Sequence, residues 1–188
     1  MKRALWCGLL CLTTVGVVRA DNVAPAAGAT FTVKTTQASV QPGGMVKVEV
    51  FVSGAVNVAA YQVMLGASGG DKGTLTMDSM TVDRQRQDFA LFNSGAEMLD
   101  VQDKASGWIG LVRVVGGTDI VKPAYIATIN FKASPDAAGT FKINIRTDNT
   151  DSFLLDTQGL LIPHKVAAAA EVTVGAPAPT RTETRKKE

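Results

Sequence analysis

Few residues of this 188-residue chain could carry catalytic chemistry. The single histidine, His164, directly follows Pro163 and has no serine or cysteine motif beside it. The only two cysteines, Cys7 and Cys11, lie near the amino terminus. Histidine-based nucleophilic catalysis and tight zinc binding both need several such side chains at matched positions. The residue inventory therefore predicts a protein that is not an enzyme, with His164 as a surface residue.

Carboxylates are the remaining candidates for chemistry. Asp148, Asp151 and Asp156 lie close together in the stretch TDNTDSFLLD. Oxygen-rich loops can hold calcium, and paired carboxylates can perform acid–base catalysis. The spacing of these three residues matches no EF-hand loop, and aspartate is also an ordinary turn residue. We therefore expect no metal site and no cofactor, and calcium binding by the three aspartates stays an open alternative.

The amino-terminal residues are typical of an export signal. Two basic residues precede an apolar stretch, residues 4–18, which is short for a membrane span, and small or branched residues end it at Ala20. We expect residues 1–20 to be a signal peptide that is removed together with both cysteines. The protein would then be secreted, extracellular or periplasmic, without a membrane span. A buried amino-terminal helix and lipidation at Cys11 are the alternatives.

The charge distribution argues against a nucleic-acid partner. The chain has 19 basic and 17 acidic residues. Residues 176–188, which have no apolar periodicity, predict a disordered basic tail. Without the signal and this tail, 12 basic and 15 acidic residues remain, so the folded part is slightly acidic. Residues 21–29 are small and contain proline, which predicts a flexible leader, and residues 30–175 remain for a single domain.

Alternating apolar residues predict strands through most of that domain. Residues 45–52 place valine at every second position, and residues 58–65 alternate in the same way. Residues 75–82 change phase near position 78, which indicates a bulge. Residues 96–103 fit one helical turn or a long loop equally well.

The clearest pair of strands is residues 124–133 and 141–146, which we expect to form a hairpin. Proline, aspartate and glycine between them, in SPDAAG, are turn residues. Together with the other alternating segments they give about nine strands, separated by turns, with no strong helix. The predicted fold is all-β: a single domain of about nine strands that is a sandwich or a jelly roll.

Several blocks of the chain resemble those of a cohesin domain. They are VAAYQVMLGAS, GWIGLVRVVGG, AYIATINFKASPDAAGTFKINI, SFLLDTQGLLIP and AAAAEVTV, in this order. The resemblance covers residues 30–175 and implies a single cohesin-like, nine-stranded jelly-roll β-sandwich related in fold to one group of carbohydrate-binding modules. It also implies a non-catalytic protein–protein interaction with dockerin modules, which carry calcium, in extracellular polysaccharide catabolism.

The resemblance implies that the partner face includes the strands at residues 58–65 and 108–115. Outward positions of these strands give the expected partner-binding residues: Ala60, Gln62, Met64, Trp108, Gly110 and Val112. Cohesins often carry asparagine and aspartate where this chain has Ala60 and Gln62, so ordinary dockerin recognition is weakened. Direct carbohydrate binding through Trp108 is the alternative function, since an outward tryptophan is a good anchor. The same ring would lie in the core if the register of its strand were reversed.

Overall fold

The computed structural model describes residues 28–91, 98–103, 108–113, 116–147 and 151–175, and of residues 98–103 and 108–113 it describes the backbone. These residues form strands, bridges and turns, and no helix occurs among them. Within the same ranges, no helix is long and apolar enough to cross a membrane. The predicted all-β class is confirmed.

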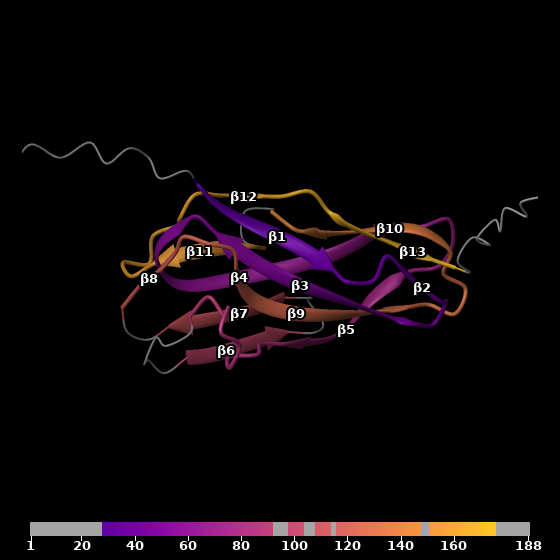
Figure 1. Ribbon diagram of the computed structural model, residues 1–188, viewed down its shortest axis with the longest axis horizontal. Helices are drawn as coiled ribbons and strands as arrows, with labels where there is room; N and C mark the ends of the chain where they lie inside the picture. Colours follow the sequence, from indigo (N-terminus) through magenta and orange to yellow (C-terminus); the bar gives the residue numbers. More distant parts are fainter. Residues whose placement is uncertain (1–27, 92–97, 104–107, 114–115, 148–150, 176–188) are drawn as a thin grey trace, which may run out of the picture.

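The strands form a sandwich of two sheets and run along its long axis (Figure 1). The order in the first sheet is β12 (His164–Val166), β1 (Ala29–Thr35), β3 (Met45–Ser53), β9 (Ala124–Ala133) and β5 (Leu75–Thr81). The order in the second sheet is β2 (Ser39–Val40), β13 (Ala170–Val174), β10 (Gly139–Ile145), β4 (Ala55–Gly69), β7 (Trp108–Arg113) and β6 (Met98–Asp103). The short strands β11 (Phe153–Asp156) and β8 (Thr118–Ile120) also pair with β4.

The core lies between the two sheets and follows the alternation in the sequence. The four valines of β3, from Val46 to Val52, are completely buried. On β4, which belongs to the other sheet, Tyr61, Val63 and Leu65 are buried as well. Because side chains of a strand alternate between its two faces, the residues between these must face outward from the sandwich. The predicted inward face of β3 is therefore confirmed, and that of β4 is confirmed from Tyr61 onward. At Ala59 the register of β4 against β11 shifts, and Val58 is buried instead of Ala59.

The predicted hairpin of residues 124–146 is wrong. β9 pairs with β3 and β5 in the first sheet, whereas β10 pairs with β4 and β13 in the second. The predicted turn does exist, since the amide of Ala137 donates to the carbonyl of Ser134 at 3.0 Å. It carries the chain across the sandwich from one sheet to the other. Period two specifies which face of a strand is buried and leaves the neighbouring strand unspecified.

Two further details of the strand prediction were tested. The register of β5 against β9 shifts between Met77 and Ser79, so the predicted bulge is confirmed. Residues 98–103 form the edge strand β6, so neither a helical turn nor a long loop is correct for them. The described residues contain thirteen strands where about nine were expected. Part of the difference arises because four separate strands, β7, β8, β10 and β11, pair with the long strand β4.

A second bulge places Tyr125 on the outer side of the first sheet. The register of β3 and β9 shifts between Val50 and Phe51, so that Tyr125 pairs with Phe51. Phe51 alternates with the core valines and therefore faces outward, and its ring contacts that of Tyr125 with centroids 6.2 Å apart. Arg86 and Phe89, from the segment after β5, contact the Tyr125 ring, and Tyr125 is completely buried.

Arg86 fastens this covering segment to the sheet. Its guanidinium lies 4.0 Å from the centre of the Tyr125 ring, donates to Glu49 at 2.9 Å, and makes two hydrogen bonds to Asp88 at 2.8 and 2.9 Å. Burial raises the pKa of Glu49, but hydrogen bonds from Lys47 and Arg86 outweigh this and hold it below its usual value. The hydrogen bond from Arg86 likewise lowers the pKa of Asp88.

Replacing Arg86 by glutamine is expected to lower the free energy of unfolding at pH 7 by about 2 kcal/mol, because charge-assisted hydrogen bonds are lost. The pKa values of Glu49 and Asp88 are lower in the folded protein than in the unfolded chain, so their ionised forms stabilise the fold at pH values above the unfolded-state pKa. This stabilisation is lost as the pH falls through the folded-state pKa. Wild type should therefore lose stability from about pH 5 downward more steeply than Arg86→Gln. Urea unfolding at several pH values measures both effects. The exposed Lys122→Gln is the control, and equal pH slopes in wild type and Arg86→Gln would contradict the prediction.

Candidate partner-binding face

The backbone register brings all six predicted partner-binding residues together. β4 pairs with β7 so that Ala60 is opposite Val112, Gln62 is opposite Gly110, and Met64 is opposite Trp108. Residues directly opposite each other in an antiparallel ladder share one face of the sheet. The side chains of β7 lie outside the described residues, so their placement here rests on register alone.

On β4, the predicted outward residues differ in exposure from their neighbours. Gln62 and Met64 are half-buried, whereas the intervening Tyr61, Val63 and Leu65 are buried in the core. Ala60 is only 5% exposed, because it is small and lies in the middle of the sheet between two flanking strands. It can therefore form the floor of a binding face and contributes little contact area of its own.

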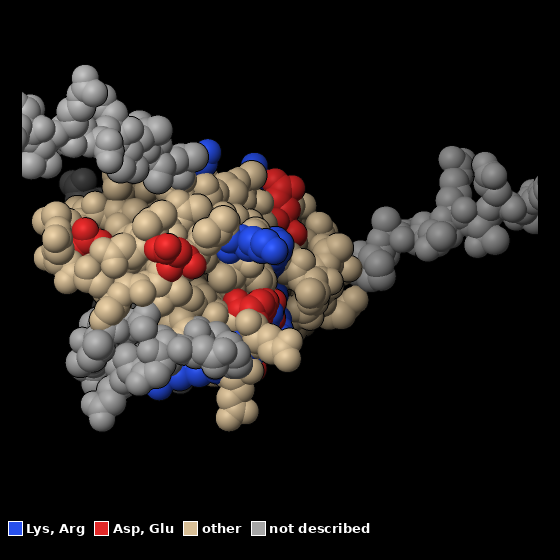
Figure 2. All heavy atoms as spheres, turned by 60° about the vertical axis from the view of Figure 1, so that its left-hand side comes forward, with Lys and Arg blue, Asp and Glu red and all other residues tan. Residues whose placement is uncertain are grey.

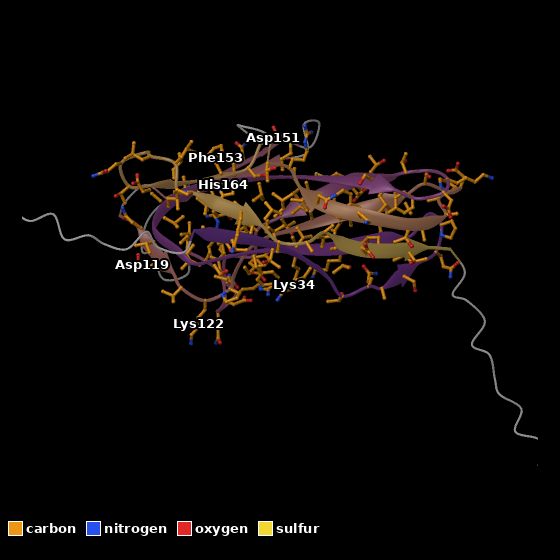
Figure 3. All side chains as sticks on the ribbon, turned by 90° about the horizontal axis from the view of Figure 1, so that it is seen from above. Lys34, Asp119, Lys122, Asp151, Phe153 and His164 are labelled. Atoms are coloured by element: carbon orange, nitrogen blue, oxygen red, sulfur yellow. The ribbon has the colours of Figure 1, made fainter. Side chains whose placement is uncertain are left out.

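Strand β11 adds two residues to this face that the sequence analysis missed. Phe153 pairs with Gln62, and Leu155 pairs with Ala60, on the side of β4 opposite β7. Both are half-buried, whereas Leu154 between them is completely buried opposite Tyr61. Figure 3 shows Phe153 on the opposite side of the sandwich from Lys34, a residue of the first sheet. The sequence did contain a signal for these two residues. Phe153, Leu154 and Leu155 are three consecutive apolar residues, and because side chains alternate between the faces of a strand, they cannot all point into the core.

We name the outward side of β11, β4 and β7 the partner face. Three described residues between β10 and β11 border one end of it: Arg146, Asp151 and Ser152. Gln62 Nε2 donates to the carbonyl of Asp151 at 3.1 Å, the amide of Met64 donates to Ser152 Oγ at 3.0 Å, and the amide of Arg146 donates to the carbonyl of Met64 at 2.8 Å. Part of the hydrogen-bonding capacity of Gln62 is therefore used within the protein.

The described aspartates of the calcium alternative have partners within the chain. Asp156 Oδ1 accepts hydrogen bonds from the amides of Gln158 and Leu160, at 2.8 and 2.9 Å, which is the geometry of an aspartate that stabilises a turn. Asp151 Oδ2 lies 3.0 Å from Arg146 Nε. Asp148 lies outside the described residues. Among the described residues, no group of three or more histidine, cysteine or acidic side chains is placed to hold a metal ion.

His164 packs at an edge of the first sheet. It begins β12, which pairs with β1. Its ring meets that of Phe31 edge to face with centroids 5.2 Å apart, and Nδ1 lies 3.3 Å from the carbonyl oxygen of Ile162. The side chain is half-buried, so the expected surface position is only partly correct.

Charged side chains of both signs are interspersed over the molecule. On the surface shown in Figure 2, basic and acidic side chains lie beside each other among uncharged ones. Lys47 and Glu49 approach to 3.1 Å on the first sheet, and Lys142 and Glu171 to 3.5 Å on the second. This surface therefore does not present a single-sign patch of the kind that binds nucleic acid.

Comparisons with known proteins identify the fold. No protein-family model matches the sequence, and no curated protein sequence matches it. Among solved structures, one match is the third cohesin of ScaC from Acetivibrio cellulolyticus, in complex with the ScaB dockerin, with a TM-score of 0.55 and 14% identity over 79% of this chain and 99% of that chain. A second is a type II cohesin module from the cellulosomal adaptor scaffoldin ScaA of the same organism, with a TM-score of 0.51 and 14% identity over 80% and 99% of the two chains.

A type I cohesin, the seventh of ScaB from Pseudobacteroides cellulosolvens, matches with a TM-score of 0.50 and 14% identity over 81% of this chain and 96% of that chain. The chain thus spans nearly the full length of each of these domains. It has the fold of cohesin domains, a jelly-roll β-sandwich, which confirms the predicted fold.

Proposed function

We propose that this protein is a secreted, non-catalytic, cohesin-like module that binds a dockerin-type protein through the partner face. The observation that carries the proposal is the convergence of outward apolar positions on that face. Phe153 and Leu155 of β11 flank the outward residues of β4, and the register sets Trp108 of β7 opposite Met64. Large apolar side chains gathered at the centre of one surface are typical of protein-binding sites.

The similar solved structures support a protein partner. The ScaC cohesin is in complex with a dockerin, and the ScaA module belongs to a cellulosomal adaptor. By this analogy the protein would act outside the cell in an assembly linked to polysaccharide degradation. Residues 1–20 would direct its export, residues 21–29 would be a flexible leader, residues 30–175 would form the binding module, and residues 176–188 would be a basic tail.

Direct carbohydrate binding remains the second candidate function, because Phe153 is a partly exposed aromatic residue on the partner face. Flat polysaccharides are usually bound by several coplanar rings. Both tyrosines are unsuitable for this, since Tyr61 is 2% exposed and Tyr125 is completely buried. Retention of the purified chain on cellulose, chitin or xylan would favour this candidate over the first.

Titration of the purified protein with the dockerin modules encoded in the same genome tests the proposed function. Because dockerins carry calcium, we expect a one-to-one complex with at least one module in calcium, and loss of this complex with a chelator. A chain with residues 1–27 and 176–188 removed serves as the control and should bind equally well. The proposal would be wrong if no dockerin module binds at the concentrations that saturate known cohesin–dockerin pairs.

A further inference from the structure

Exposed lysines form a line across the outward side of the first sheet, which faces away from the partner face. Lys34 of β1 pairs with Glu49 of β3. Lys47 lies two residues from Glu49 on the same side of β3, and two residues further lies Met45, which pairs with Lys132 of β9. Three neighbouring strands therefore each contribute one lysine to a diagonal line.

A fourth lysine, Lys165, continues the line on β12. It pairs with Thr30 of β1, four residues before Lys34, so it lies on the same side of the sheet. Two residues of a strand span about 6.8 Å and neighbouring strands lie about 4.8 Å apart, so successive lysines from Lys34 to Lys132 are about 8 Å apart and Lys165 is about 14 Å from Lys34. We name these four residues the lysine row: Lys165, Lys34, Lys47 and Lys132.

Three members of the lysine row keep their charge available. Within the described residues, Lys34, Lys132 and Lys165 have no acidic side chain within ion-pair distance. Lys34 Nζ lies 4.8 Å from the centre of the Phe51 ring, which holds the ammonium group in place without neutralising it. An anion that approaches these ammonium groups therefore displaces no acidic partner.

The fourth member, Lys47, belongs to a cluster that is neutral as a whole. Glu49 Oε1 lies 3.1 Å from Lys47 Nζ and 2.9 Å from Arg86 Nη1, and Arg86 also pairs with Asp88 at 2.8 Å. Two carboxylates thus balance two cations. The Lys47 side chain is 55% exposed, so its ammonium group remains accessible, and the net charge of the row comes from the other three lysines.

The two sheets carry opposite net charge. Among the described strands, those of the first sheet contain four lysines and two acidic residues, whereas those of the second sheet, with β8 and β11, contain one lysine, one arginine and five acidic residues. Residues 82–91, which contact the outward side of the first sheet, add two of each sign. Figure 3 shows Lys34 on the side of the sandwich opposite Phe153 of the partner face. A polyanion is therefore attracted to the lysine row and repelled by the second sheet.

Uncharged polar groups lie beside the lysine row. Thr76 pairs with Lys132, and Asn130 pairs with Lys47 and donates to Ser79 Oγ at 3.0 Å. Thr30 and Thr32 lie at the outward positions before Lys34 on β1, and both are half-buried. Hydroxyl and amide groups both donate and accept hydrogen bonds, so they match the hydroxyl groups of a sugar.

These features do not fit a nucleic acid. Duplex DNA carries one charge per about 1.7 Å of its axis, so lysines about 8 Å apart would leave most phosphates without a cation. Single-stranded nucleic acids are bound through exposed aromatic rings, whereas Phe51 is 9% exposed and Tyr125 is completely buried. A polysaccharide with carboxylate groups has a lower charge density and many hydroxyl groups, which fits separated lysines among threonine and asparagine side chains.

We propose that the lysine row is a second binding site, which takes a linear polysaccharide of uronic acid units. The carboxylates of the polysaccharide pair with the ammonium groups of the row, and its hydroxyl groups bond to the polar side chains beside them. The site lies on the sheet that does not form the partner face, so this inference does not rest on the proposed function. A chain with both sites would link a protein partner to an acidic polysaccharide.

Titration of the full chain with polygalacturonate, in buffer without calcium, tests the site. We expect binding whose affinity falls about tenfold or more between 0.05 and 0.5 M NaCl, because salt screens exposed charges. A chain with both Lys34→Gln and Lys132→Gln should bind about tenfold more weakly. Its melting temperature should stay nearly unchanged, because both side chains are exposed. The basic tail is the same in every variant and cannot cause a difference between them.

Two controls isolate the lysine row and the carboxylates. Lys132→Gln alone should weaken binding about threefold, whereas Lys142→Gln removes the same charge from β10 of the second sheet and should leave the affinity unchanged. Methyl-esterified polygalacturonate keeps the sugar backbone and loses the carboxylate charges, so it should bind at least about tenfold more weakly than the acid.

Four results would overturn the inference. They are no binding of polygalacturonate by wild type, equal affinities of wild type and the double variant, equal affinities for the acid and its methyl ester, and tighter binding of single-stranded DNA or of vesicles with anionic lipids. The last result would show that the row takes a different class of polyanion. None of these results bears on the dockerin titration, so the two proposals can fail separately.

Discussion

Replacement of Trp108 by alanine is expected to weaken binding to the dockerin partner about 30-fold, while the free energy of unfolding changes by no more than about 1 kcal/mol. The register places Trp108 opposite Met64, a half-buried residue that alternates with core residues of β4. A tryptophan at an outward position contributes little to the core, whereas a core tryptophan replaced by alanine would cost about 3–5 kcal/mol. At the centre of an interface, the same ring can act as an anchor.

Calorimetric titration and thermal melts measure the two parts of this prediction separately. Trp108→Phe is the control, because it keeps an aromatic ring at this position and should retain most of the affinity. A large fall in the melting temperature of Trp108→Ala would place the ring in the core. It would then remove Trp108 from the partner face, even if the affinity also fell.

Replacement of Tyr61 by alanine is expected to lower the free energy of unfolding by about 4 kcal/mol, enough to unfold a marginally stable domain. Tyr61 is 2% exposed, and its hydroxyl donates to the carbonyl of Ile126 at 2.7 Å. Ile126 lies at the bulge of β9, so this bond joins the second sheet to the first at an interruption of the ladder. The substitution removes both the buried ring and the partner of that carbonyl.

Tyr61→Phe separates the two contributions. It keeps the ring and leaves the Ile126 carbonyl without this donor, so it should cost about 1–3 kcal/mol. Urea unfolding curves measure both variants, and Met45→Ala, at an exposed position, is the control, expected within about 0.5 kcal/mol of wild type. Equal stabilities of Tyr61→Phe and wild type would show that the hydrogen bond between the sheets contributes nothing.

The sequence by itself determined the fold class and much of the inward and outward alternation. The valines of β3 are buried on the predicted face, and so are Tyr61, Val63 and Leu65 of β4. This succeeds because alternation is a local property: a strand with one buried face must place apolar residues at every second position. The six predicted partner-binding residues also fall on facing positions of β4 and β7, since each strand carries its own outward set.

Only the tertiary structure decided which strands are neighbours. It separates β9 and β10 into different sheets, although they are consecutive and joined by a predicted turn. It also brings Phe153 and Leu155 beside β4, and Leu161 beside Leu155, from a part of the chain about 90 residues or more after Gln62. Such pairing depends on contacts between distant segments, whose free energy comes from filling one shared core, and the alternation within any single strand is compatible with several neighbours.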